Sequence, residues 1–344
     1  MLRKLSKIFL VLATVSLVCC VGLLLTHTYF NNHFFHVASE LQHPASQFFK
    51  NDRDTVSVLV ASDSGSNNYV LEHVISHARR THGDYDFMMH LGDMATTSIT
   101  GYYWMLSEIR PRLHGMPLYT IPGNHDVTKR VAGKYETNKA YYTTVMGPAY
   151  YWFGYNNTLF IALDTSMSDL DAVQAHWLDE TLRNIRPLFR NCVIFSHVPP
   201  INVRPDWAPD HTMHADDAAR FADIIRKYKI DAIFCGHVHF YSKTPFAGTT
   251  LYTIPASGQE PRDRDNPSYG YVSLVAHKNA PLDVDVEYVH FDGDKREFIE
   301  EWWARDILST RSQDLVSVLL SLTAMFGAIA LALHVAHRLR NRTR

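Results

Sequence analysis

Gly123-Asn124-His125-Asp126 is the stretch of sequence that decides the fold, because similar polar clusters stand before and after it. Each of five such clusters comes shortly after an apolar run. The runs are Val56–Val60, Phe87–Met89, Leu118–Ile121, Val193–Phe195 and Ala232–Phe234. Runs of Val, Ile and Phe of this length predict strands that are buried on both faces. We therefore expect five strands whose carboxyl ends carry the polar clusters.

The side chains that follow these strands are of the types that bind metal ions. They are Asp63, Asp93, Asn124, His197, His237 and His239. Ligand sites in open α/β sheets form beyond the carboxyl ends of the strands, so one rim would collect all six residues. A single Gly-Asp or Asn is more often a turn, but alternate side chains such as His237 and His239 share one face and can reach one ion. The ordered set favours a metal site.

The ordered set resembles the calcineurin-like metallophosphoesterase family, which includes the purple acid phosphatases. The motifs that carry the resemblance are Ser62-Asp63-Ser64-Gly65, Gly92-Asp93, Gly123-Asn124-His125-Asp126, Ser196-His197 and Gly236-His237-Val238-His239. The resemblance covers roughly residues 55 to 290 and includes a helix around Gln174, Trp177, Leu178 and Leu182. It implies an α/β (α+β) fold, a four-layer αββα sandwich of two mixed sheets packed face to face with helices outside.

The resemblance also implies how the residues divide around two divalent metal ions. One ion would be held by Asp63, Asp93 and His239, and the other by Asp93, Asn124, His197 and His237, with Asp93 bridging both. Oxygen donors mixed with imidazoles, without a thiolate, suit Mn, Fe or Zn. Two such ions about 3.5–4 Å apart would lower the pKa of a shared water, and the bridging hydroxide would attack phosphorus in line.

The catalytic residues that the resemblance implies are His125 and Asp126. His125 would protonate or stabilise the leaving oxygen, and Asp126 would accept the other ring proton and so set the tautomer of that His. Asn124, His211 and His214 are candidates for binding the substrate phosphate. For the two His residues, which follow the fourth motif, a solvent-exposed loop is the alternative.

Gly65 departs from the commonest pattern of the family, which has Asp-x-His in the first motif. Purple acid phosphatases also have Gly there and compensate with a Tyr three residues after the second-motif Asp, but this chain has Thr96 at that place. The Asp63-side ion would then have three protein ligands, with water, Thr96, Asn67 or Asn68 as candidate substitutes. We expect this ion to bind more weakly than its partner.

Both ends of the chain contain uncharged segments of membrane-spanning length. We expect basic tails at 1–7 and 337–344, transmembrane helices at 8–26 and 315–336, a linker at 27–54, the phosphoesterase domain at 55–292 and an amphipathic juxtamembrane segment at 293–314. Basic residues favour the cytoplasmic side, which would place the domain outside the cytoplasm, at a plasma or inner membrane. A cleaved signal peptide is the alternative for 8–26, although no small-x-small site follows it.

Charge and cysteine usage narrow the classes of partner. The two tails hold seven of the 33 Lys and Arg, which leaves 26 against 35 Asp and Glu in the remainder. An acidic domain argues against long nucleic acid as a partner, because that affinity depends on Lys and Arg. Cys192 and Cys235 each come just before a candidate metal-binding His, and they are either buried free thiols or a bonded pair on neighbouring strands.

The sequence therefore predicts a membrane-anchored, metal-dependent hydrolase of phosphoric esters. The motifs leave monoesters and diesters open as substrates. Because two anchors would hold the site close to a bilayer, we expect either a phosphorylated small molecule or a lipid-linked phosphate ester. The alternative is a catalytically silent scaffold or receptor with the same fold, and the sequence leaves the oligomeric state open.

Overall fold

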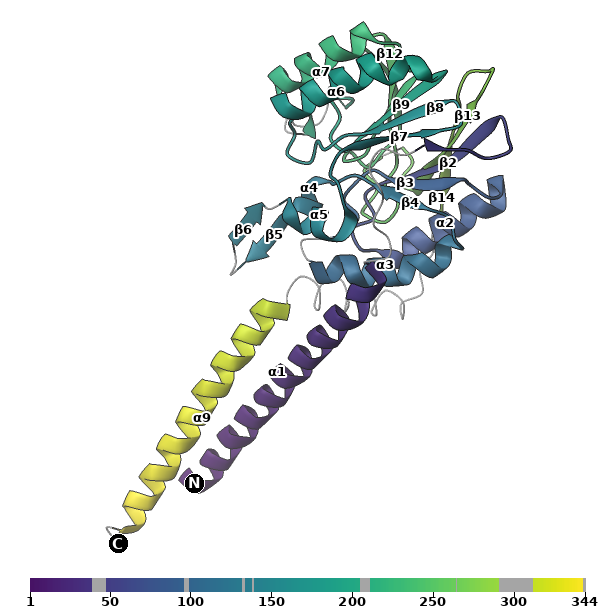
Figure 1. The fold of residues 1–344 in the computed structure, drawn as a ribbon. Coiled ribbons are helices and arrows are strands. Elements are labelled where there is room, and N and C mark those ends of the chain that lie inside the picture. Colours follow the sequence, from purple (N-terminus) through teal and green to yellow (C-terminus); the bar gives the residue numbers. More distant parts are fainter. Residues whose placement is uncertain are drawn as a thin grey trace.

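The structure, a computed structural model, describes residues 1–38, 48–95, 99–131, 134–137, 139–204, 211–263, 265–290 and 312–342. These residues form a domain built on two large sheets and a pair of long helices that extend from it (Figure 1). The five-stranded sheet and α3 lie toward the long helices, whereas the seven-stranded sheet with α6 and α7 lies on the far side (Figure 1).

The five-stranded sheet has the order β14-β13-β2-β3-β4. Its strands are β2 (Thr55–Ala61), β3 (Phe87–His90), β4 (Leu118–Thr120), β13 (Tyr269–His277) and β14 (Asp283–Val289). Strands β2, β3 and β4 are parallel, and β13 is antiparallel to β2. The parallel strands are connected by α2 (Asn68–His82) and α3 (Ile99–Leu113). The first three polar clusters therefore meet at one edge of this sheet.

The seven-stranded sheet has the order β1-β7-β8-β9-β10-β12-β11. Its strands are β1 (Phe48–Phe49), β7 (Tyr151–Tyr155), β8 (Thr158–Ala162), β9 (Asn191–Ser196), β10 (Ala232–Cys235), β11 (Ser242–Phe246) and β12 (Thr249–Thr253). Its crossover elements are α6 (Ala172–Asn184), the short 3-10 helix η2 (Arg186–Leu188) and α7 (Ala215–Lys227). Because β8, β9, β10 and β12 are parallel, the last two polar clusters also share one edge.

Short elements follow the third cluster. The single helical turn α4 (Asn124–Val127) leads into a hairpin of β5 (Thr128–Val131) and β6 (Lys134–Thr137) and then into α5 (Ala140–Met146). The hairpin projects from the side of the domain, away from both large sheets (Figure 1).

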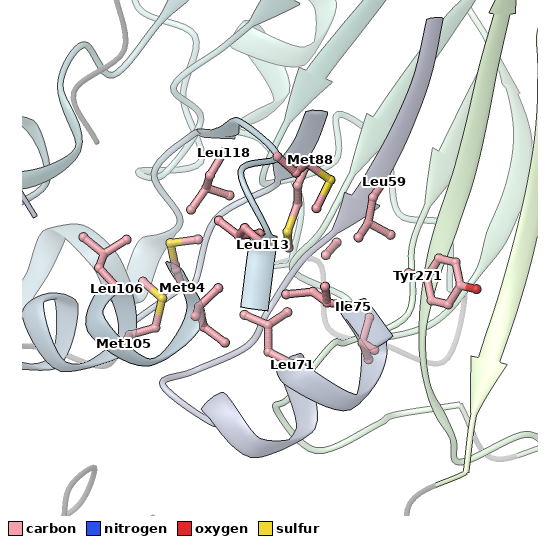
Figure 2. Close-up of a cluster of buried hydrophobic side chains, with 14 of the residues drawn as sticks. Leu59, Leu71, Ile75, Met88, Met94, Met105, Leu106, Leu113, Leu118 and Tyr271 are labelled. Carbon is pink, nitrogen blue, oxygen red and sulfur yellow. The ribbon is translucent and has the colours of Figure 1, made fainter. Parts of the chain in front are cut away.

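Three hydrophobic cores separate the layers of the domain. The core between the two sheets contains Phe87 from β3 with Phe153, Phe160 and Phe195 from the other sheet. A second core fills the space between the five-stranded sheet and α2 and α3 (Figure 2). The third joins the seven-stranded sheet to α6 and α7. Two sheets with helices on both outer faces are the predicted four-layer αββα sandwich, which is confirmed.

The five apolar runs of the sequence are strands in the structure, namely β2, β3, β4, β9 and β10. All but the first and third residues of β2 are buried, and the other four strands are buried throughout, as continuous apolar runs predict. The helix expected around Gln174 is α6. These predictions are confirmed.

The terminal helices α1 (Leu2–Ala38) and α9 (Ser312–Arg342) pack against each other in antiparallel directions. The Ser6 hydroxyl donates to the Ala330 carbonyl at 3.0 Å, and the Ser16 hydroxyl donates to the Leu319 carbonyl at 2.8 Å. Both are long and apolar enough to cross a membrane, and both termini lie at the end far from the domain (Figure 1).

The segments next to these helices differ in part from the expected linkers. Helix α1 continues beyond residue 26 as far as Ala38, and β1 pairs with β7, so parts of 27–54 have regular structure. Of the amphipathic segment at 293–314, residues 293–311 lie outside the described residues, and the rest begins α9.

The four cysteines are free thiols. Cys235 pairs with Ser196 across β10 and β9, whereas Cys192 lies at the opposite end of β9. Burial raises the pKa of both the Cys192 and Cys235 thiols to about 12. Of the two alternatives left open by the sequence, the structure shows buried free thiols.

We predict that Phe160→Ala lowers the free energy of unfolding by about 3–5 kcal/mol, because Phe160 is fully buried between the sheets against Phe87 and Phe153. Urea unfolding of the detergent-solubilised chain measures this. The matched control is Leu188→Ala, since Leu188 is 67% exposed and should change stability by less than about 0.5 kcal/mol. Equal effects of the two substitutions would contradict the assignment of the core.

Candidate metal centre

Four of the six candidate ligands have a left-handed backbone. The φ angles are 54° at Asp63, 52° at Asp93, 71° at His237 and 58° at His239. A positive φ is uncommon outside glycine and costs free energy that the surrounding structure must offset. Such strain concentrates at functional sites, and here it turns each side chain away from its strand end toward the shared rim.

Glycines let the loops that carry the ligands approach one another closely. A Cβ atom on Gly123 would lie 2.2 Å from the Asp93 backbone nitrogen, and one on Gly92 would lie 2.5 Å from the Gly123 nitrogen. A Cβ on Gly236 would lie 2.0 Å from the Ser62 hydroxyl oxygen. No other residue fits these distances, so the glycines of the motifs bring the second loop against the third and the fifth against the first.

One group of ligands gathers around the Asn124 side-chain oxygen. That oxygen is 3.1 Å from His197 Nε2 and 3.0 Å from His237 Nδ1. Asp93, His197 and His237 each place one potential ligand atom within 4.8 Å of the others. The Leu91 carbonyl is 2.7 Å from His197 Nδ1 and accepts its proton, which leaves Nε2 free to bind a metal. The structure brings all four residues expected for this ion together.

The second group forms around Asp63. Its Oδ1 atom is 3.4 Å from His239 Nε2, while its Oδ2 accepts the His237 backbone N–H at 2.9 Å. The Glu260 carbonyl accepts the His239 Nδ1 proton at 2.9 Å, which points Nε2 toward Asp63. Asp63 Oδ1 is buried and makes no hydrogen bond. A buried carboxylate oxygen without a donor, next to an imidazole nitrogen, fits a bound cation.

The electrostatics of the site suit cation binding. Burial alone would raise the pKa of Asp63, but His239 holds it below its ordinary value. Burial together with His197 lowers the pKa of the His237 ring well below its ordinary value. For His197, burial opposes the charged form, and the Asp93 and Asp63 carboxylates outweigh it and raise the pKa. The site thus holds buried carboxylates beside imidazoles, and a bound cation would offset the charge of the carboxylates.

The Asp126 carboxylate joins two of the loops that carry candidate ligands. It accepts the backbone N–H groups of Gly123 at 2.8 Å, Met94 at 3.0 Å and Ala95 at 3.0 Å. Asp126 therefore connects the loop after β3 to the loop after β4. The expectation that it also sets the His125 tautomer stays a prediction.

His125 lies at the surface of the site. Its backbone N–H donates to Asp93 Oδ1 at 2.9 Å, and its ring Nε2 is 3.9 Å from Asp93 Oδ2. The side chain is 48% exposed, whereas the Asp93 side chain is 2% exposed. A ring held next to the Asp93 carboxylate yet open to solvent can reach a molecule bound there.

The two downstream His residues differ in position. His211 Nδ1 is 3.3 Å from His237 Nε2, so this ring lies against one of the candidate ligands. His214 immediately precedes α7, where its side chain is 69% exposed and lies 3.8 Å from the Asp217 carboxylate. The structure brings His211 to the site and leaves His214 at the start of a helix.

The backbone carbonyls of Leu91 and Glu260, which orient two of the ligand rings, are absent from the sequence prediction. Carbonyls have no signature in a sequence, because every residue carries one. Leu91 could have been suspected only from its position just before Gly92-Asp93. Glu260 could not, since it lies 21 residues beyond the His that it contacts.

The fold and the site define a metallophosphoesterase. A family model described as calcineurin-like phosphoesterase matches residues 56–241, and the chain belongs to this family.

The individual proteins that this chain resembles share low sequence identity with it. The chain is 26% identical over 175 residues to a probable glycerophosphodiester phosphodiesterase of Arcobacter nitrofigilis, a match that covers 46% of this chain and 58% of that protein. A purple acid phosphatase from yellow lupin (Lupinus luteus) seeds superposes with a TM-score of 0.57 at 16% identity, over 71% of this chain and 55% of that one. A dimetal phosphatase from Danio rerio superposes with a TM-score of 0.53 at 14% identity, over 68% of this chain and 96% of that one. The chain thus spans little more than half the length of the first two, and the structural likenesses show the fold.

We predict that Asp126→Ala weakens Mn²⁺ binding by about 10–100-fold, because the loops that carry Asp93 and Asn124 lose their shared acceptor. Isothermal titration of the metal-free chain measures this. His125→Ala should leave the affinity within about twofold, since its ring lies outside the ligand group. If Asp126→Ala kept the Mn²⁺ affinity and lowered only the catalytic rate, the role implied by the resemblance would hold instead.

Proposed function

We propose that this chain is a membrane-anchored hydrolase of phosphoric esters that acts with two divalent metal ions bridged by Asp93. The observation that carries the proposal is the convergence of Asp63, Asp93, Asn124 and three His residues at one rim, on a scaffold of the matching family. When bound, such a metal pair supplies a hydroxide near neutral pH and neutralises charge on the phosphate oxygens. The donor set of oxygens and imidazoles suits Mn, Fe or Zn.

The side chains of the chain would then divide the remaining work. His125, exposed and 3.9 Å from Asp93, is placed to donate a proton to the leaving oxygen. Asn124 and His211 border the same ligand group and are candidates for contacting the phosphate. His214 is a weaker candidate, because its ring faces solvent beside Asp217.

We further propose that α1 and α9 cross a membrane as a hairpin, with both termini in the cytoplasm and the domain on the opposite side. An antiparallel pair with its two ends together fits an even number of crossings (Figure 1). The tails carry the Lys and Arg residues that favour the cytoplasmic side, and the domain between them is acidic. In this arrangement 8–26 is a retained anchor, and the phosphoesterase domain spans 55–292.

The substrate class that we favour is a lipid-linked phosphate ester. The loops with Asp63, Asp93 and Asn124 belong to the five-stranded sheet, the layer nearer the terminal helices (Figure 1). Helix α1 lies against α3, which follows the Asp93 loop directly in the chain. A site held in this way is close to a bilayer, although the same ligands would accept a soluble phosphorylated molecule.

We predict that the purified chain with Mn²⁺ hydrolyses an aryl phosphate or its diester. Asp93→Asn should abolish most of this activity, because it removes the bridging charge. His125→Ala should lower kcat by about 10²–10⁴-fold, because the leaving oxygen loses its proton donor. A colorimetric assay of both esters measures these effects and separates monoesterase from diesterase.

The control for His125→Ala is His277→Ala, since His277 is bonded to Asp283 on the far strands of the sheet. Its activity should match that of the wild type. If the wild type were inactive across metals and ester types, a silent scaffold or receptor would become the better account, with the altered residue Gly65 as its structural basis.

We predict that the enzyme hydrolyses a lipid substrate in its own bilayer faster than a soluble, short-chain form of the same substrate. The chain is reconstituted in vesicles, and phosphate release is compared for long-chain phosphatidic acid in the same bilayer and a short-chain, monomeric phosphatidic acid. For a diesterase, phosphatidylglycerol of both lengths replaces them, and the release of glycerol phosphate or glycerol is measured, because hydrolysis of one bond of a diester frees no inorganic phosphate. At least a tenfold higher kcat/KM for the bilayer substrate is expected, and equal turnover would count against a lipid substrate.

A further inference from the structure

The loop that follows β12 runs beside the first motif. The Ser257 backbone N–H donates to the Ser62 carbonyl at 2.7 Å, and the Gln259 N–H donates to the Asp63 carbonyl at 2.7 Å. The Ser62 N–H in turn donates to the Ser257 hydroxyl at 3.3 Å. These bonds hold Gln259 next to Asp63, although 196 positions separate the two in the sequence.

The Gln259 side chain occupies the space beside Gly65. A Cβ atom on Gly65 would lie 2.5 Å from Gln259 Cγ, 2.9 Å from its Nε2 and 3.1 Å from its Cδ. A larger residue at position 65, such as the His of the commoner first motif, would therefore displace this side chain from its present position. The glycine at 65 and the glutamine at 259 are two parts of one arrangement.

The backbone around Gln259 contacts both residues that are specific to the Asp63-side ion. Its own N–H binds the Asp63 carbonyl, and the next residue, Glu260, accepts the His239 ring proton at 2.9 Å. The Gln259 side chain is partly exposed, and no hydrogen bond with the described residues engages its amide. The Gln259 amide, with its Nε2 beside Gly65, thus lies at the place where the first motif lacks a ligand, and a half-turn about its last side-chain bond brings its oxygen there.

The substitutes considered from the sequence fit less well. Asn67 uses both ends of its amide, because its oxygen accepts the Val70 N–H that starts α2 and its nitrogen donates to the Gly258 carbonyl at 2.9 Å. Asn68 is buried with neither amide atom bonded, so it is the rival. Thr96 lies outside the described residues. Among the described residues, the three heavy atoms nearest to a Cβ on Gly65 all belong to Gln259.

We propose that the side-chain oxygen of Gln259 binds the metal ion on the Asp63 side and replaces the ligand that Gly65 cannot supply. The assignment rests on the dinuclear centre proposed above. Carbonyl-type oxygens are suitable ligands for Mn²⁺ and for similar hard cations. A neutral amide in place of an imidazole also agrees with the expectation that this ion is the weaker of the two.

The test is isothermal titration calorimetry of the metal-free, full-length chain with Mn²⁺ in detergent micelles. Wild type should bind two Mn²⁺ ions with two separate affinities. The affinity that Asp63→Asn weakens belongs to the ion on the Asp63 side. Gln259→Ala should weaken that affinity by about tenfold or more and leave the other within about twofold. Gln259→Glu, which keeps an oxygen at the same reach, should bind at least as tightly as wild type.

The matched control is Asn184→Ala, which removes an exposed amide at the end of α6 on the outer face of the seven-stranded sheet. Its two affinities should stay within about twofold of wild type. Thermal unfolding in EDTA should be the same for wild type and Gln259→Ala, because the amide makes no hydrogen bond that apo stability would lose. A selective loss of metal without a loss of apo stability separates ligation from a structural role.

Three outcomes would overturn the assignment. They are unchanged affinities in Gln259→Ala, the selective loss appearing instead in Asn68→Ala or Thr96→Ala, and binding of fewer than two ions by wild type. Failure of the proposed hydrolysis is distinguishable, because a wild type that binds two ions without hydrolysing any ester would leave the ligand assignment intact.

Discussion

The metal centre depends on the Asp126 carboxylate, which is buried between two loops and accepts N–H groups from both. A buried carboxylate is costly unless its oxygens are hydrogen-bonded, so the two loops and the anion stabilise one another. Asp93 and Asn124 belong to these same two loops. Gly92 and Gly123 allow the backbones of the two loops to approach each other closely. The Asp93 carboxylate and the Asn124 amide are therefore positioned without a bound metal.

The two hydrophobic layers around the five-stranded sheet hold this arrangement in place. Met94, directly after Asp93, is buried in the same core as Met105 and Leu106 of α3 (Figure 2). The end of α1 nearer the domain lies against α3 (Figure 1). Helix α1 thus contacts α3, and α3 shares a hydrophobic core with Met94 of the Asp93 loop.

The strands, and the gathering of the candidate ligands at their ends, could be predicted from the sequence because their signals are local. Each apolar run is buried in its sheet, and the polar residue after it reaches the rim whatever the rest of the chain does. The contacts of Asp126 could not be predicted, since its partners are backbone N–H groups that no residue type marks. The contact of Gln259 with Gly65 could not be predicted for a related reason, because only the folded chain brings the two together. The two-residue strand β1 and the extension of α1 to Ala38 have no periodic pattern that separates them from a linker.

The central claim is that five strand-end loops build one centre for two metal ions with Asp93 between them. Anomalous diffraction from crystals of the Mn²⁺-loaded chain tests it most directly. Two peaks about 3.5–4 Å apart, one beside Asn124, His197 and His237 and one beside Asp63 and His239, with Asp93 touching both, are the predicted result. A single peak, or two peaks without Asp93 between them, would contradict the account.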